Sequence, residues 1–246
     1  MNELIGKKAL VTGGSRGIGA ATAVALAERG ADVAITYNSS ADAAAAVLKE
    51  IEALGRRGFA YAVDSGAAGA VADGVRRAAE SLGGLDILVN NAGVGAIAPI
   101  TDLTPQDVDR VLAVNIRGVY AATQAAVPLL SDGARLIHLG SCAAARVTSP
   151  GMTLYAMSKA ALVGLSKALA RELGARNITS NVIQPGPTDT DMNPSDGPFA
   201  APQIADLALD RFGTPAEVAA AVAYLAGPQA AYITGTELTI DGGHTA

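Results

Sequence analysis

Short apolar runs alternate with longer helical patterns along the whole of this chain of 246 residues. Such an alternation, with no linker and no internal repeat, is typical of a parallel sheet covered by helices on both faces. It therefore predicts one doubly wound α/β domain over 1–246, with about seven strands. We place the strands at 9–11, 33–37, 59–63, 86–89, 135–139, 181–183 and 237–240, and the helices at 17–29, 39–54, 67–82, from 104 onward, at 154–175 and at 215–225.

Composition and charge exclude several classes of protein. The formal charge is −5 and the basic residues are scattered, whereas a nucleic-acid binder carries a basic patch. The single cysteine, Cys142, allows no intrachain disulfide, and no cluster of metal ligands accompanies it. The first residues lack the apolar core of a signal peptide, and no apolar stretch is long enough to span a bilayer. We expect a soluble cytoplasmic protein without a metal.

A glycine-rich turn lies between the first predicted strand and its helix, at 12–19. Glycines allow the backbone to turn tightly and to approach a pyrophosphate, and the helix that follows offers free N–H groups and a positive dipole end. The spacing from Gly13 is Gly-x-x-x-Gly-x-Gly, and no Gly-Lys-Ser/Thr follows as in a P-loop. Plain tight turns also use glycine, but this position between a strand and a helix favours phosphate binding.

The end of the second predicted strand indicates which dinucleotide would bind. Proteins that bind NAD place an acid there for the ribose 2′-hydroxyl, whereas this chain has Tyr37, Asn38 and Ser39. Asp42 lies close by, but its spacing from Ser39 is that of an acid in the first turn of a helix. Arg16 could pair with a 2′-phosphate or be an ordinary surface arginine.

Polar residues also end the later strands. Asp64 follows the third strand, and an Asn-Asn-Ala-Gly run at 90–93 follows the fourth. This run is either a simple turn or a ligand loop at the carboxyl edge of the sheet. In the helix that begins near Thr104, Asn115 has apolar neighbours; asparagine is a poor helix-interior residue, which indicates a role for its amide.

Tyr155 and Lys159 are four residues apart at the start of a helix and so share one of its faces. A nearby ammonium lowers the pKa of a phenol, and a phenol tuned in this way could give a proton to a carbonyl or take one from an alcohol. Alone, such a pair is more often just two neighbours on a helix.

The longest irregular segment is 187–212, which has no strong periodicity and contains four prolines. Segments of this kind are usually lids or binding loops. We therefore expect a substrate lid at 187–212.

Taken in order along the whole chain, these motifs resemble those of the short-chain dehydrogenase/reductase family in its single-domain Rossmann-type form. The resemblance implies a catalytic set of Asn115, Ser141, Tyr155 and Lys159. It also implies a dinucleotide site made of Gly13, Ser15, Arg16, Gly17, Ile18, Gly19, Tyr37, Asn38, Ser39, Asp64, Ser65, Asn91, Ala92, Gly93, Tyr155, Lys159, Pro185, Gly186, Thr188, Thr190 and Met192. With no acid at 37–39, the expected cofactor is NADP(H).

The resemblance also implies a role for each catalytic residue. Tyr155 would be the general acid in ketone reduction or the base in alcohol oxidation. Lys159 would lower the pKa of Tyr155 and bind the nicotinamide ribose. Ser141 would hold the substrate oxygen, and Asn115 would anchor a water that supplies protons to Lys159. Ser141 and Tyr155 are then donors aimed at the charge that develops on the carbonyl oxygen.

Within the family, the chain is most similar to bacterial 3-oxoacyl-acyl-carrier-protein reductases, so the expected substrate is a ketone such as a 3-oxoacyl thioester. Reductases of small or cyclic ketones and alcohols share the same features. Such proteins are commonly tetramers, and we expect a homo-oligomer that binds neither nucleic acid nor membrane.

Two other functions compete with this one. A serine hydrolase would use Ser141 with His138 or His244, but 139 and 143 are not the glycines of a nucleophile elbow. A non-catalytic nucleotide sensor could use the same fold.

Overall fold

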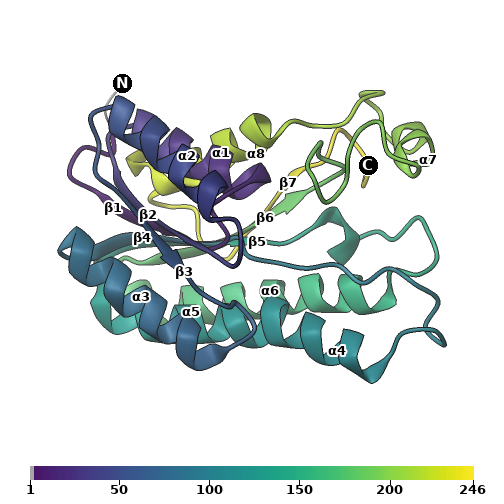
Figure 1. Cartoon of the computed structure of the whole chain (residues 1–246), viewed down its shortest axis with the longest axis horizontal. Coiled ribbons are helices and arrows are strands. Elements are labelled where there is room, and N and C mark those ends of the chain that lie inside the picture. The colour runs from purple at the N-terminus through teal and green to yellow at the C-terminus, as the bar shows by residue number, and fades with distance from the viewer. Residues whose placement is uncertain (1–2) are drawn as a thin grey trace.

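The computed structural model describes residues 3–246 and has three layers (Figure 1). A sheet of seven strands lies in the middle, with helices above and below it. The strands are β1 Lys8–Val11, β2 Asp32–Tyr37, β3 Gly58–Ala62, β4 Leu85–Asn90, β5 Leu130–Leu139, β6 Thr179–Pro185 and β7 Glu237–Ile240. All seven predicted strands are therefore present. The last has the predicted bounds, and the other six are lengthened or shifted by a few residues at their ends.

The strand order is β3-β2-β1-β4-β5-β6-β7, and every neighbouring pair is parallel. The chain moves outward from β1 to β3 and then returns to the other side of β1 with β4. Ligands of such sheets bind beyond the carboxyl ends of the strands where this reversal occurs. The predicted doubly wound Rossmann-type fold is confirmed, and its switch point lies between β1 and β4.

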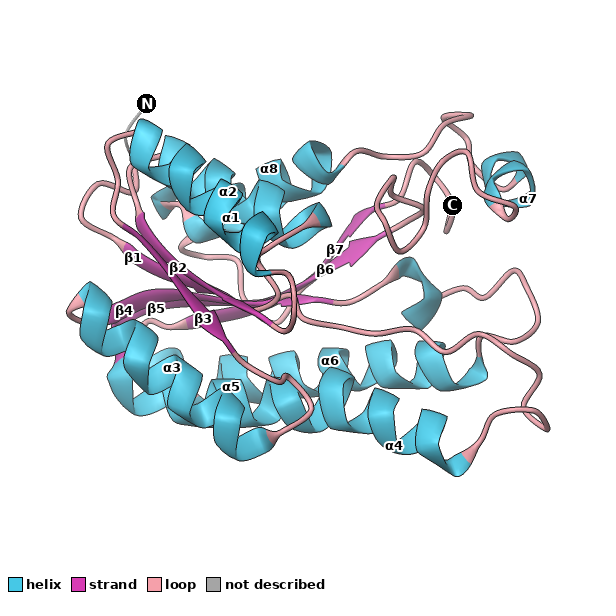
Figure 2. Cartoon of the chain, in the orientation of Figure 1, coloured by secondary structure: helices cyan, strands magenta, loops and turns pink. Residues whose placement is uncertain are grey.

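Helices cover both faces of the sheet, as Figures 1 and 2 show. One face carries α1 Gly17–Glu28, α2 Ala41–Ala53 and α8 Pro215–Ala226, and the other carries α3 Ala68–Leu82, α4 Pro105–Leu112, α5 Val119–Ala126 and α6 Thr153–Glu172. Thr104 and Thr214 begin α4 and α8 with capping boxes and a proline at the first turn, which fixes where these helices start.

The core is divided by the sheet because successive side chains of a strand point to opposite faces. Val11 and Val89 pack toward α1 and α8, whereas Leu10 and Leu88 pack toward α3 and α5. All four are fully buried. The strands of the switch point are thus anchored on both faces, which makes their carboxyl ends a rigid support for a site.

Two parts of the chain differ from the regular pattern. Ala113–Gly118, which contains Asn115, is a π-helical turn between α4 and α5, whereas the sequence predicted one continuous helix. A short helix, α7 Ala200–Ala205, lies inside the segment expected to be irregular. Within residues 3–246, no helix combines the length and the hydropathy needed to cross a membrane.

Candidate active site

The predicted site residues lie on the loops at the carboxyl ends of the strands and on the helix that crosses below them. Figure 2 shows these loops gathered at the same end of the sheet as α7. The parallel sheet brings together five segments that are far apart in the sequence, namely 12–19 after β1, 37–39 after β2, 64–65 after β3, 91–93 after β4 and 141 after β5. Tyr155 and Lys159 reach the same place from α6.

The glycine-rich turn has no room for side chains where it bends. A Cβ on Gly19 would lie 2.3 Å from the Gly13 carbonyl oxygen, and one on Gly14 would lie 2.6 Å from Ile35. Gly17 has a φ of 53°, in the left-handed region that glycine favours. The first turn of α1 has no side-chain cap at Arg16, so its N–H groups point out of the turn. This backbone cradle fits a pyrophosphate.

Asn91 and Thr12 join the ends of β1 and β4. The Asn91 amide donates to the Thr12 and Gly13 carbonyl oxygens at 2.9 and 3.0 Å. The Thr12 hydroxyl accepts from the backbone N–H groups of Asn91 and Ala92 at 3.0 and 3.1 Å. The side chain and the backbone N–H of Asn91 are therefore both engaged in shaping the turn.

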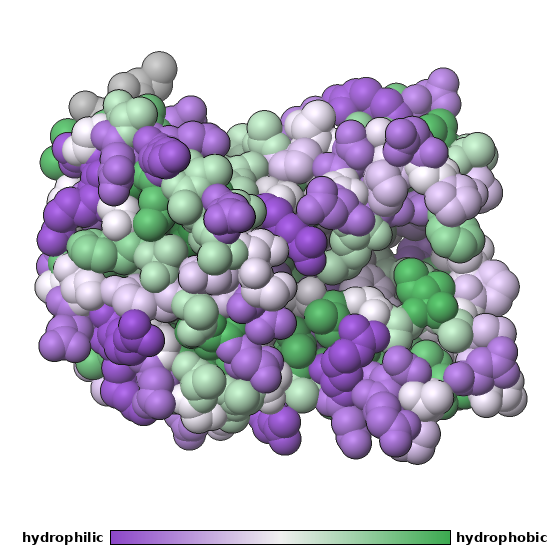
Figure 3. Space-filling view, viewed as in Figure 1, coloured by the Kyte–Doolittle hydropathy of each residue, from purple (hydrophilic) through white to green (hydrophobic). Residues whose placement is uncertain are grey.

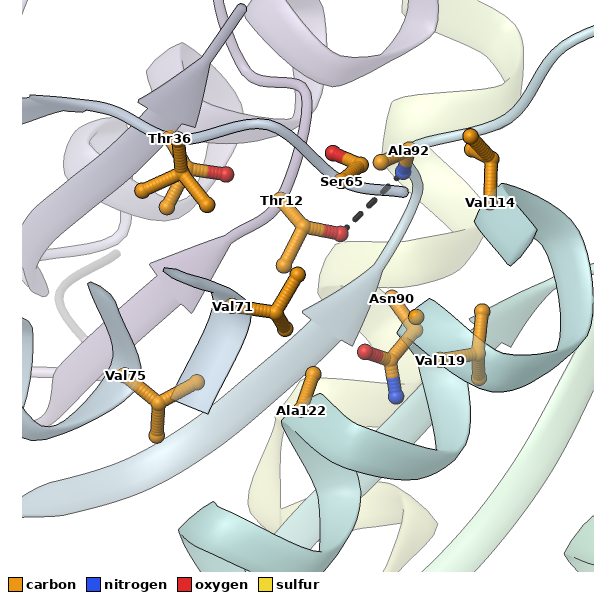
Figure 4. Close-up of a pocket in the computed structure, with 12 residues that line it drawn as sticks. Thr12, Thr36, Ser65, Val71, Val75, Asn90, Ala92, Val114, Val119 and Ala122 are labelled. Atoms are coloured by element: carbon orange, nitrogen blue, oxygen red, sulfur yellow. Dashed lines mark hydrogen bonds between the residues drawn. The ribbon is translucent and has the colours of Figure 1, made fainter. Parts of the chain in front are cut away.

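A pocket opens beside these strand ends (Figure 4). Its walls come from β1, β2 and β4 and from α3 and α5, with Thr12 bonded to Ala92 across it. Most of the lining is apolar, with a few polar groups. The lining residues are Thr12, Thr36, Val63, Ser65, Val71, Val75, Asn90, Ala92, Val114, Gly118, Val119 and Ala122. Ser65 and Ala92, two residues predicted to bind cofactor, are among them.

The end of β2 has no carboxylate. Tyr37 is half-buried, and Asn38 and Ser39 are exposed. Asp42 lies in the first turn of α2, as predicted, although Ser40 caps that helix without a side-chain hydrogen bond. Arg16 is exposed and pairs with Asp191 of the 187–212 segment at 3.6 Å. The sequence did not reveal this ion pair, which places the predicted lid against the glycine-rich turn.

Lys159 is held beneath Tyr155. Its ammonium is buried and donates to the Leu139 carbonyl oxygen at 2.8 Å, and it lies 5.8 Å from the centre of the Tyr155 ring. Burial lowers the pKa of Lys159 to about 8. Burial raises the pKa of the Tyr155 phenol, and the Ser141 hydroxyl opposes part of that shift. The expected lowering of the Tyr155 pKa by Lys159 is therefore not seen here, since the ammonium is directed at a carbonyl instead.

Ser141 begins the loop after β5. Its hydroxyl accepts from the Ala143 N–H at 3.2 Å, and its own N–H donates to the Gln184 side chain at 2.6 Å. Cys142 is buried behind it, and burial raises the pKa of that thiol to about 11, which keeps it unreactive at neutral pH. Ser141 and Tyr155 thus form a pair of hydroxyl donors, and a carbonyl oxygen placed against both would be stabilised as it gains charge.

Asn115 uses its whole amide within the protein. Its oxygen accepts from the Val94 N–H at 2.9 Å, and its NH2 donates to the Val94 carbonyl at 2.9 Å and to the Ser158 hydroxyl at 3.0 Å. The π-helical turn directs this residue toward the 93–94 backbone. Turns of this kind often occur at functional sites. The sequence correctly indicated a role for the amide but gave no sign of these partners.

The two histidines do not support a hydrolase. His138 is fully buried in β5, and its ring nitrogens contact Asn90 at 3.1 Å and Ser180 at 3.2 Å. Burial lowers its pKa to about 4, so it stays neutral. His244 is also buried, and neither histidine hydrogen-bonds Ser141 within residues 3–246.

The 187–212 segment lies over the carboxyl ends of the strands. Thr188 is buried and bonds to Gly186, Thr190 lies against Gly17, and Met192 is 63% exposed. Figure 3 shows a hollow on this side of the molecule with apolar side chains beside it. Large apolar residues are exposed in this segment and in the loops after β4 and β5, namely Met192, Phe199, Leu209, Ile97, Ile100 and Val147.

Three residues that shape the site were not among the predicted site residues, namely Thr12, Ser158 and Gln184. Each makes at least one hydrogen bond to a predicted site residue. Their spacing along the chain carries no signal, because the partners come from different elements.

Comparisons with known proteins agree with this geometry. A family model described as enoyl-(acyl carrier protein) reductase matches residues 13–245. A short chain dehydrogenase from Burkholderia cenocepacia J2315, solved in complex with NADP, is 55% identical, with each chain covered to 100% and a TM-score of 0.98. The cyclic-di-GMP-binding biofilm dispersal mediator protein of Escherichia coli K12 is 43% identical over 98% of each chain. The 3-oxoacyl-(acyl-carrier-protein) reductase FabG of Staphylococcus aureus is 38% identical over 96% of this chain and 97% of its own.

Proposed function

We propose a function from the premise that this chain belongs to the short-chain dehydrogenase/reductase family and is an NADP(H)-dependent oxidoreductase of carbonyl and alcohol groups. The proposed reaction is the reduction of an apolar ketone to a secondary alcohol, or its reverse. The observation that carries the proposal is the pairing of Ser141 with Tyr155 above a buried lysine at the carboxyl edge of the sheet. Without a titratable donor at this point, the fold would bind a dinucleotide but would not move a proton.

Tyr155 is the proton donor in reduction and the acceptor in oxidation. NADPH supplies the hydride when bound. Ser141 donates to the carbonyl oxygen and holds it against the Tyr155 hydroxyl, so that the proton arrives as negative charge develops. Burial raises the pKa of the Tyr155 phenol, which keeps it protonated for the reductive direction.

Lys159 connects this donor to the cofactor and to a proton supply. Its ammonium is directed along the carboxyl end of β5 by the Leu139 carbonyl, where the nicotinamide ribose is expected. A lysine whose pKa is about 8 exchanges protons readily near neutral pH. In this proposal Asn115 anchors the water that returns a proton to Lys159. The side chain of Asn115 fixes the π-helical turn that holds this water.

The NADP(H) site follows the five strand ends. The backbone of the glycine-rich turn takes the pyrophosphate, and the 64–65 and 91–93 loops take the adenosine. Arg16 with Tyr37, Asn38 and Ser39 takes the 2′-phosphate, because these side chains offer a cation and neutral donors where a carboxylate would repel it. Gly186, Thr188, Thr190 and Met192 cover the nicotinamide after Pro185, and the last three belong to a lid over 187–212.

The substrate belongs to one of two chemical classes. The Staphylococcus aureus relative is a 3-oxoacyl-(acyl-carrier-protein) reductase by name, which favours a 3-oxoacyl thioester. The exposed apolar residues of the lid and of the facing loops equally suit a small or cyclic apolar ketone. We also propose that the chain assembles as a homotetramer.

A screen of NADPH oxidation tests the function. The candidate substrates are a 3-oxoacyl thioester, a cyclic ketone, a linear ketone and an enoyl thioester. Turnover of any ketone supports the proposal, and the preferred member assigns the substrate class. Reduction of the enoyl thioester alone would overturn ketone chemistry.

The same screen separates a sensor from an enzyme. The Escherichia coli relative is named for binding cyclic-di-GMP. The nucleotide-sensing alternative is correct if the chain binds that dinucleotide in calorimetry and no ketone among the candidate substrates supports NADPH oxidation.

A further inference from the structure

Gln184 is a buried polar residue near the carboxyl end of β6 and is 2% exposed. Its side-chain oxygen accepts the backbone N–H of Ser141 at 2.6 Å. Its side-chain NH2 donates to the Glu237 carboxylate at 3.1 Å. A glutamine buried with both ends of its amide engaged is fixed in one orientation, and so is the backbone that it holds.

The residue before Ser141 is shaped to admit this side chain. A Cβ on Gly140 would lie 2.1 Å from the Gln184 side-chain oxygen and 2.8 Å from Val182. Gly140 also donates its N–H to the Ile183 carbonyl at 2.8 Å. The backbone of β5 therefore runs directly past the amide of Gln184 at the point where the strand gives way to the Ser141 loop.

The far end of the amide leads to the edge of the sheet. Glu237 is the first residue of β7, and its other carboxylate oxygen pairs with Lys167 of α6 at 3.1 Å. A carboxylate on the NH2 side polarises an amide and strengthens the hydrogen bond that its oxygen accepts. The contacts form a chain from Lys167 through Glu237 and Gln184 to the Ser141 N–H.

We propose that Gln184 is a positioning residue that sets the Ser141 hydroxyl against the substrate oxygen, and that Glu237 supports it from the edge of the sheet. This inference rests on the proposed role of Ser141. Gln184 touches neither the substrate nor the reacting atoms. It acts by fixing the backbone from which the Ser141 side chain projects, and a small displacement of such a donor costs catalysis heavily.

Gln184→Met tests the proposal, since methionine keeps the length of the side chain and removes the acceptor. We expect kcat for the preferred ketone to fall by about 10- to 100-fold while the Kd of NADPH stays unchanged. In a Ser141→Ala background, the same substitution should have no further effect on kcat. Equal losses in both backgrounds, or an unchanged kcat, would overturn the proposal.

Asn181→Leu is the matched control. Asn181 lies on the same strand, is equally buried and bonds to the Ile233 carbonyl and the Thr236 N–H. Within residues 3–246 its side chain makes no hydrogen bond to the Ser141 loop. Asn181→Leu should lower the melting temperature, and its effect should be the same in the wild type and in the Ser141→Ala background. Glu237→Leu, a milder change at the sheet edge, should lower kcat by a few-fold in the wild type and leave it unchanged in the Ser141→Ala background. A loss of kcat in both backgrounds would contradict the coupling of Glu237 to Ser141.

A second readout does not depend on turnover. Hydrogen exchange of the Ser141 amide should be slow in the wild type and fast in Gln184→Met. Equal exchange rates would overturn the positioning role. If the wild type turns over no ketone, the proposed function fails, and the exchange result still decides whether Gln184 holds Ser141.

Discussion

Replacing Lys159 by methionine should remove a pH dependence from the stability of the protein. The ammonium is buried, and burial lowers its pKa from 10.5 to about 8. At about 1.4 kcal/mol per pKa unit, keeping this lysine charged costs the folded state about 3 kcal/mol. The dependence of stability on pH measures this cost directly, because it reports the difference between the folded and unfolded pKa of this one group.

The sign follows from proton counting. Below the folded pKa of about 8, the lysine is charged in both states and the whole cost is present. Between about pH 8 and 10.5, the unfolded state holds more protons, so raising the pH stabilises the wild type. From about pH 7 to about pH 10.5, the free energy of unfolding of the wild type should rise by about 2–3 kcal/mol relative to that of Lys159→Met.

Urea unfolding of both proteins, followed by circular dichroism at the two pH values, measures this difference. Lys167→Met is the control, because Lys167 lies on the same helix but is exposed and pairs with Glu237. Its stability curve should run parallel to that of the wild type. If the Lys159→Met curve also runs parallel to that of the wild type, burial does not lower the pKa of Lys159 in the folded state, and the reasoning fails.

Three further outcomes follow from the site. Arg16→Ala should lower kcat/KM for NADPH by about 10- to 100-fold, the loss of one charge-assisted contact, and leave NADH use intact; an unchanged ratio would contradict the assignment of the 2′-phosphate. Amide exchange across 187–212 should slow when NADPH and substrate bind, and equal protection in both states would remove the lid. Ketone reduction should fall, and alcohol oxidation rise, as the pH passes the pKa of Tyr155, so superimposable pH profiles for the two directions would rule out Tyr155 as the titrating group.

The fold could be predicted from the sequence because its signals are local. Each strand is a short apolar run, and the helix starts at Thr104 and Thr214 carry capping residues at fixed spacing. The position of the site followed from topology, because parallel strands present their carboxyl ends at one edge. Residues at six separate strand or helix ends were therefore expected together before any contact was known.

What the sequence missed depends on contacts between distant elements. The π-helical turn at Asn115 arises where its amide finds the Val94 backbone and Ser158, partners that periodicity cannot reveal. The helix α7 is too short for its own propensity to stand out. Lys159 was expected to lower the pKa of Tyr155, but its ammonium is held by the Leu139 carbonyl, and burial dominates the titration of both groups.

The central claim is that Tyr155 donates the proton to a ketone reduced by NADPH. Stopped-flow measurement of NADPH oxidation with the preferred ketone, for the wild type and for Tyr155→Phe, tests it most directly. Phenylalanine keeps the ring and removes only the hydroxyl, so the Kd of NADPH should stay the same while the rate falls by at least about 100-fold. A Tyr155→Phe protein that reduces the ketone at a rate near that of the wild type would contradict the mechanism.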